Sequence, residues 1–143
     1  MPQFYRLEPE VAGGLGQGTV LQRDHRPPKV TRLYYVFDGW LGDDLLESYP
    51  CFIMTKIMAD RLLRLGPTGV ALREVEISTS PTFRDGHSNL HLPDFLWLDV
   101  QGTPGRDDLG LEQDAHHVVS HRVLDCLRTG HLAQCRIESY SPM

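Results

Sequence analysis

Residues 43–66, DDLLESYPCFIMTKIMADRLLRLG, and residues 107–130, DDLGLEQDAHHVVSHRVLDCLRTG, follow the same plan. Each stretch begins with two aspartates and a leucine, continues into an apolar run that ends on Thr55 or Ser120, and closes on a glycine. A hydroxyl side chain can accept a backbone N–H at the start of a helix, so both hydroxyl positions predict a helix N-cap. Leucine, valine or methionine then recurs at helical spacing. The two stretches therefore predict two copies of an extended segment followed by a short helix.

The flanks of these stretches extend the match. Residues 33–39 and 96–102 are both apolar, rich in aromatic or branched side chains, and end on a turn glycine, which predicts a buried strand in each. Residues 70–77 and 132–140 predict a further strand after each helix. The expected fold class is therefore α+β, with internally duplicated strand–loop–strand–helix–strand units, a mainly antiparallel sheet and two short helices.

The length of 143 residues fits one domain. Within an N-terminal arm, residues 4–7 and 19–21 predict a hairpin joined by a glycine-rich turn. A later stretch rich in Ser, Pro, Asn and Asp predicts a long connecting loop, which is a candidate contact surface. The expected single domain thus has four parts: the arm over 1–32, a first unit over 33–77, the connecting loop over 78–94 and a second unit over 95–140.

Acidic residues are concentrated in two places. The net charge is −5, and residues 38–47 hold four acids and no base, whereas residues 99–114 hold five acids and one arginine. An acidic total argues against nucleic-acid binding, which needs a dominant basic face.

No apolar run approaches the ~20 residues of a membrane span, so no membrane partner is expected. The odd count of three cysteines and the absence of a signal-like N-terminus predict free thiols and a cytoplasmic location.

Motifs for catalysis, metal binding and nucleotide binding are absent from the sequence. The glycine run at 13–18 lacks the spacing of a phosphate-binding loop. The oxygen-rich aspartate pairs at 43–44 and 107–108 leave a magnesium site open. His117, His121 and Asp125, with His116 beside them, form a cluster that suggests zinc chemistry, and His87 and His91 are the only plausible further ligands. However, the expected cap at Ser120 separates His117 from the helix that carries the other two. We therefore expect no catalytic residue, no bound metal and no cofactor.

A family resemblance adds a functional hypothesis. Residues 95–100 (FLWLDV), 107–109 (DDL) and 118–125 (VVSHRVLD) resemble, in this order, the C-terminal half of bacterial immunity proteins that are encoded beside polymorphic toxins. The resemblance extends over about residues 33–140 and leaves the N-terminal arm unmatched. It implies a non-enzymatic protein that binds and neutralises a cognate toxin.

The acidic loops are the expected contact surface, since many toxins that act on anionic substrates have basic active sites. Trp40 lies in a glycine-flanked acidic loop, where an aromatic side chain is either a lid over the core or an exposed binding anchor. Two other functions stay open: a small metal-dependent hydrolase that uses His117, His121 and Asp125, and a structural dimerisation domain. The expected partner-binding residues are Asp38, Trp40, Asp43, Asp44, Asp107 and Asp108.

Overall fold

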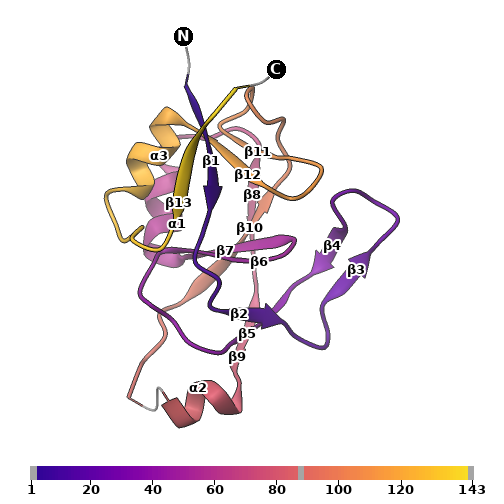
Figure 1. Ribbon diagram of the computed structural model, residues 1–143, viewed down its shortest axis with the longest axis vertical. Helices are drawn as coiled ribbons and strands as arrows, with labels where there is room; N and C mark the ends of the chain where they lie inside the picture. Colours follow the sequence, from indigo (N-terminus) through magenta and orange to yellow (C-terminus); the bar gives the residue numbers. More distant parts are fainter. Residues whose placement is uncertain (1–2, 87–88, 142–143) are drawn as a thin grey trace.

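The computed structural model describes residues 3–86 and 89–141. Over these residues the chain forms thirteen strands and three helices, most of the strand pairs being antiparallel, and the expected α+β class is confirmed (Figure 1). Within the same part of the chain, no helix is both long and apolar enough to cross a membrane.

Two four-stranded antiparallel sheets share one strand order. In the first, the order is β6 (Leu45–Ser48), β7 (Cys51–Thr55), β10 (Phe95–Val100) and β8 (Val70–Arg73), and helix α1 (Lys56–Leu63) follows β7. In the second, the order is β11 (Leu109–Leu111), β12 (His117–Ser120), β1 (Phe4–Glu8) and β13 (Arg136–Tyr140), and helix α3 (His121–Leu127) follows β12. Each sheet therefore consists of a hairpin, a helix connection and an edge strand around one inserted central strand.

The inserted strands cross between the two halves. β1 precedes the first hairpin in the chain but lies in the second sheet, and β10 precedes the second hairpin but lies in the first sheet. The registers match, because Phe95 lies opposite the cap Thr55 and Phe4 lies opposite the cap Ser120. The two halves thus exchange their central strands, so that neither sheet is complete without the other half of the chain.

This arrangement corrects the alignment of 33–39 with 96–102. β5 (Tyr34–Phe37) lies in a third sheet, between β2 (Gly13–Leu15) and β9 (Glu76–Thr79), and it pairs with β9 in parallel. The structural counterpart of β10 is β1. Both β5 and β10 are buried apolar strands, and an apolar pattern does not specify which sheet a strand joins.

Residues 4–8 of the expected N-terminal arm form a central strand of the second sheet. Leu7 in β1 is fully buried, and β1 pairs with β12 and β13 rather than in the expected hairpin of 4–7 with 19–21. Instead β3 (Val20–Gln22) pairs with β4 (Lys29–Arg32) in a two-stranded hairpin that stands beside the body of the molecule (Figure 1).

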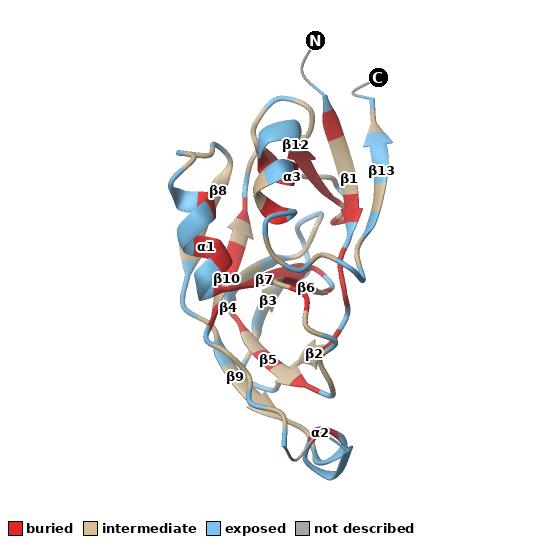
Figure 2. Ribbon diagram, turned by 90° about the vertical axis from the view of Figure 1, so that its left-hand side faces the viewer, coloured by how far each residue is buried: buried red, intermediate tan, exposed pale blue. Residues whose placement is uncertain are grey.

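The segment that follows the first helix also differs from expectation. The single strand expected over 70–77 is divided into β8 and β9, which belong to different sheets. The expected connecting loop 78–94 contains the end of β9 and a third helix, α2 (Pro81–Gly86). Helix α2 lies at the lower end of the molecule (Figure 2). Phe83 of α2 is buried, and its side chain joins an apolar cluster that holds the helix in place.

Two apolar clusters form the core. The first lies between the paired sheets and helices α1 and α3, and it includes Leu7, Phe52, Met58 and Leu124. The second fills the lower part around β5 and the start of β10, and it includes Tyr35, Phe37, Phe95 and Trp97. Burial follows the strands, and most of β7 and β12 is buried (Figure 2). β10 contributes to both clusters and so connects them.

Candidate functional site

Asp44 and Asp108 occupy equivalent positions at the start of the two hairpins. The Asp44 carboxylate accepts a hydrogen bond from the Thr55 hydroxyl at 2.6 Å and from the backbone N–H of His131 at 2.7 Å. The Asp108 carboxylate accepts from the Ser120 hydroxyl at 2.8 Å and from the backbone N–H of Thr68 at 3.1 Å. Each aspartate therefore joins the helix N-cap of its own half to the segment that follows the helix of the other half.

Asp108 also forms an ion pair. Its oxygens lie 3.0 Å and 2.6 Å from Nε and a terminal nitrogen of Arg122. The Arg122 hydrogen bonds, together with those from Thr68 and Ser120, hold the pKa of the Asp108 carboxyl well below its usual range. Arg122 in turn donates to the carbonyl of Leu65 at 2.8 Å, just beyond helix α1.

The remaining two aspartates also serve the fold. Asp43 is 1% exposed, and its carboxylate accepts from the backbone N–H groups of Ala133 at 2.9 Å and Gln134 at 2.7 Å. Asp107 accepts from the N–H of Thr103 at 2.7 Å and so closes the turn before β11. Asp43 is therefore buried, and Asp44, Asp107 and Asp108 are partly buried with carboxylate oxygens that accept hydrogen bonds inside the chain. A contact between these four residues and a partner stays a prediction.

Trp40 lies partly buried on the 38–44 loop. Its Nε1–H donates to the carbonyl of Asp43 at 2.9 Å, and its ring meets Phe95 edge-on with centroids 6.0 Å apart. Trp40 thus packs against the second core cluster as a lid, which was one of the two alternatives for this residue. One side of the residue still lines a shallow surface pocket.

This pocket has a volume of about 300 Å³ and is the place where Asp38 and Trp40 meet exposed apolar side chains. Val11 is 67% exposed and Leu41 is 71% exposed, the two highest values among the large apolar residues of the described chain. Glu10 forms the floor, where its buried carboxylate accepts from the N–H of Leu41 at 2.7 Å. We name Val11, Asp38, Trp40 and Leu41 the acidic–apolar surface.

Sequence reasoning missed Val11 and Leu41. Val11 was assigned to an N-terminal arm, and the hydrogen bonds of its neighbours Glu10 and Ala12 bring it beside the 38–44 loop. The sequence does carry a signal for Leu41. Trp40 and Leu41 lie next to each other between two glycines of an acidic loop, and so short a loop cannot bury both side chains.

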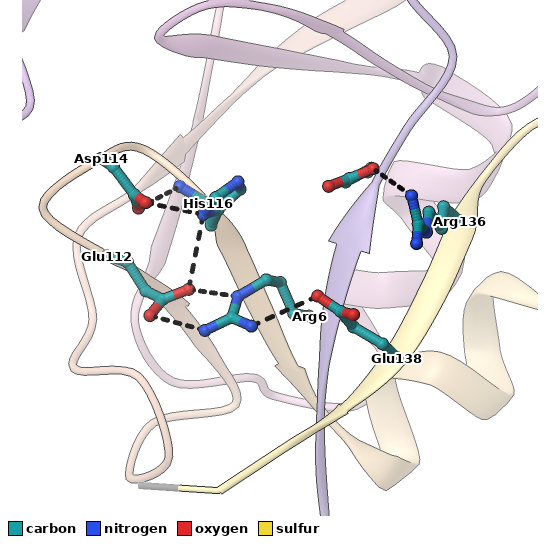
Figure 3. Close-up of polar contacts among 7 residues, drawn as sticks. Arg6, Glu112, Asp114, His116, Arg136 and Glu138 are labelled. Carbon is teal, nitrogen blue, oxygen red and sulfur yellow. Dashed lines mark hydrogen bonds and ion pairs between the residues drawn. The ribbon is translucent and has the colours of Figure 1, made fainter. Parts of the chain in front are cut away.

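A second charged group surrounds Arg6 on β1. The guanidinium donates to both oxygens of Glu112, at 2.6 Å and 3.0 Å, and to Glu138 at 3.3 Å (Figure 3). The Glu112 hydrogen bond raises the pKa of Arg6 above its usual value. Because β1, β13 and the segment after β11 each supply one member, this network fastens the exchanged strand to its sheet.

Glu112, Asp114 and His116 form the one described group whose ligand atoms lie close enough together to hold a metal ion. His116 Nδ1 lies 2.9 Å from the Asp114 carboxylate and 3.9 Å from that of Glu112 (Figure 3). However, both Glu112 oxygens already accept from Arg6, so a metal ion would have to displace a bidentate ion pair.

The cluster suggested for a hydrolase is not assembled. His121 and Asp125 pair on the exposed face of α3, with Nε2 and Oδ2 3.3 Å apart. His117 is fully buried on β12 and packs against Phe52, with ring centroids 4.7 Å apart. The strand and the helix therefore direct the two histidines to different environments. His91 is exposed, and His87 lies outside the described residues.

Comparison of the chain with models of protein families gives no match, and comparison with curated proteins gives none either.

Proposed function

We propose that this chain is a non-enzymatic protein of the immunity type, which binds a cognate bacterial toxin and neutralises it. The observation that supports this proposal is the acidic–apolar surface, where Val11 and Leu41 stand exposed beside Asp38 and the edge of Trp40. Exposed apolar side chains that lie together mark interaction surfaces, and tryptophan is enriched among the residues that dominate the binding energy of such surfaces.

The charge of this surface suits a basic partner. Asp38 is exposed, and no ion pair engages it within the described residues. A toxin that acts on an anionic substrate carries a basic active site, which an exposed carboxylate beside an apolar anchor can occupy. Attraction between opposite charges also accelerates association, which matters for an inhibitor that must act before the toxin does.

The proposed location is the cytoplasm. All three cysteines are free thiols, and none has a disulfide partner in the described chain. Burial raises the pKa of Cys51 to about 12 and also raises that of Cys126, so these thiols are poor nucleophiles at neutral pH. Their chemistry therefore adds no enzymatic role to the binding role.

The test uses the protein encoded by the neighbouring gene as the toxin. Asp38→Lys combined with Leu41→Arg is expected to weaken toxin binding at least about a hundredfold, measured by isothermal titration calorimetry. The first change reverses the charge of the surface, and the second places a positive charge where an apolar side chain is expected to contact the toxin. Inhibition of the toxin is expected to fall in parallel. The variant should keep the melting temperature of the parent, since both side chains are exposed.

The matched control is Asp60→Lys combined with Leu63→Arg on α1. Asp60 is exposed and Leu63 is 53% exposed, so this variant makes the same chemical change on another face. It is expected to bind within about twofold of the parent. A toxin that remains unbound and active beside the parent protein would contradict the proposal. A chain that forms only homodimers would instead favour the dimerisation function.

A further inference from the structure

A groove opens between the body of the molecule and the β3–β4 hairpin. It has a volume of about 440 Å³, within the usual range of ligand-binding sites. One wall comes from the segment around Pro27 and from β4, the other from β10, and the start of β7 closes one end. It shares no lining residue with the acidic–apolar surface.

The groove begins where β7 and β10 separate. These strands pair only as far as Trp97 opposite Ile53, although both continue beyond this point. The next residues on the two strands, Leu98 with Asp99 and Phe52 with Cys51, line the groove instead. On this side, residues 98–100 therefore have no strand partner in the described chain, while β8 pairs with them on the other side.

The opposite wall is also a strand edge. β4 pairs with β3 alone among the described residues, and Lys29 and Val30 of β4 line the groove. A strand edge with free backbone N–H and C=O groups accepts an additional extended chain. Two such edges therefore face one space, and partly exposed apolar groups from Val30 and Leu111 lie along its walls to receive side chains.

The charge of the groove defines the occupant. Arg26 and Lys29 are exposed at the wall, and no carboxylate pairs with either of them in the described chain. The one acidic lining residue, Asp99, is already paired with Arg73 at 2.7 Å. The groove is therefore basic in total, in contrast to the acidic–apolar surface and to the net charge of the chain.

We propose that this groove binds an extended acidic peptide segment, which adds as a strand to the free edge of β10. Backbone hydrogen bonds to the strand edge at residues 98–100 hold the segment, Arg26 and Lys29 pair with its carboxylates, and its alternate apolar side chains pack against Val30 and Leu111. This binding is independent of the proposed toxin contact, because the two surfaces use different residues and attract opposite charges.

The test uses the full chain and a fluorescein-labelled peptide of alternating valine and glutamate, followed by fluorescence anisotropy. The parent protein is expected to bind this peptide, while a peptide of alternating valine and lysine does not bind. A valine–glutamate peptide with methylated backbone nitrogens is expected to lose binding, since it keeps the charge but cannot pair as a strand. Hydrogen exchange should slow within residues 98–100 when the first peptide binds.

The diagnostic variant is Arg26→Glu combined with Lys29→Glu, which is expected to weaken peptide binding about tenfold or more. Arg106→Glu combined with Arg128→Glu is the matched control, because both arginines are exposed and lie outside the groove. This control should bind within about twofold of the parent.

Three results would overturn the proposal. Equal binding of the methylated peptide would exclude strand addition. Equal binding of the valine–lysine peptide would exclude the charge argument. Displacement of the peptide by inorganic phosphate at equal concentration would show that the groove takes a small anion and not a peptide. None of these three results would contradict the proposed toxin binding, because toxin binding is measured in a separate experiment and involves the acidic–apolar surface.

Discussion

His117 is the residue whose chemistry fits its surroundings least well. Its side chain is fully buried, and neither ring nitrogen has a hydrogen-bond partner among the described residues. Burial lowers the pKa of His117 to about 3 from an ordinary value of 6.5. A buried polar group without a partner costs about 1–3 kcal/mol, so His117 stabilises this core less than an apolar residue of similar volume.

Replacement of His117 therefore tests whether this buried side chain stays neutral in the folded protein. The unfolded chain takes up a proton at His117 below pH 6.5 whereas the folded chain does not, so acidification destabilises the parent. Between pH 7 and pH 5 this single group lowers the free energy of unfolding by about 2 kcal/mol. His117→Leu is expected to remove this loss. The difference in the free energy of unfolding between the variant and the parent should therefore be about 2 kcal/mol larger at pH 5 than at pH 7, in favour of the variant.

The measurement is urea unfolding at pH 7 and at pH 5. The exposed His91→Leu variant is the control, and it should keep the pH dependence of the parent. A parallel pH dependence of the parent and His117→Leu would mean that His117 is protonated in the folded protein.

At the scale of elements, the two helices are connected through their ends. The aspartate that supports each N-cap also accepts a backbone N–H from the segment after the other helix, at His131 for Asp44 and at Thr68 for Asp108. Gly130 leaves room at one of these places, because a Cβ there would collide with the Asp44 carboxylate and the Met58 side chain. Loss of one aspartate therefore disturbs both helices.

Asp108→Ala is expected to lower the free energy of unfolding by about 3 kcal/mol, since it leaves Ser120, Arg122 and Thr68 without their acceptor. Ser120→Ala should cost about 1 kcal/mol through loss of the N-cap. The double variant should lose less than the sum, because both changes break the same hydrogen bond. Guanidinium unfolding measures all three values.

Asp125→Ala is the control for this series. Asp125 is exposed and pairs only with His121 in the described chain, so its loss should change the free energy of unfolding by less than about 0.5 kcal/mol. A loss of unfolding free energy at Asp108 no larger than that at Asp125 would refute the role of the partly buried Asp108 carboxylate in connecting the helices.

At the scale of the whole molecule, exchange of β1 and β10 makes the two halves interdependent. The first sheet lacks its central strand without residues 95–100, and the second lacks its central strand without residues 4–8. Leu7 and Leu98, at equivalent positions of these strands, both belong to the first core cluster.

Separate fragments test this dependence. Fragments 1–88 and 89–143 are each expected to lack cooperative thermal unfolding, since each exposes the edges where the missing strand belongs. Mixed in equal amounts, they should form a 1:1 complex with a cooperative transition, measured by circular dichroism and analytical ultracentrifugation. Cooperative unfolding of either fragment alone would show that the strands are not needed by the opposite half.

The local pattern of the sequence determined the mixed α+β class, the two caps at Thr55 and Ser120, and an apolar strand over residues 96–102, which the structure has at 95–100. These features depend on neighbouring residues, because a cap needs a hydroxyl before a helix and a strand needs a run of apolar residues. The same reasoning placed Asp38 and Trp40 in a surface loop, which is where the structure has them.

Only the tertiary structure decided that β1 and not β5 corresponds to β10, and that Asp43, Asp44 and Asp108 serve the fold. Strand pairing and the fate of a carboxylate depend on backbone groups far away in the chain, such as the N–H groups of Ala133 and His131. The sequence does not show whether a carboxylate accepts hydrogen bonds from water or from a backbone N–H far away in the chain. Only folding brings such an N–H group within hydrogen-bond distance of the carboxylate.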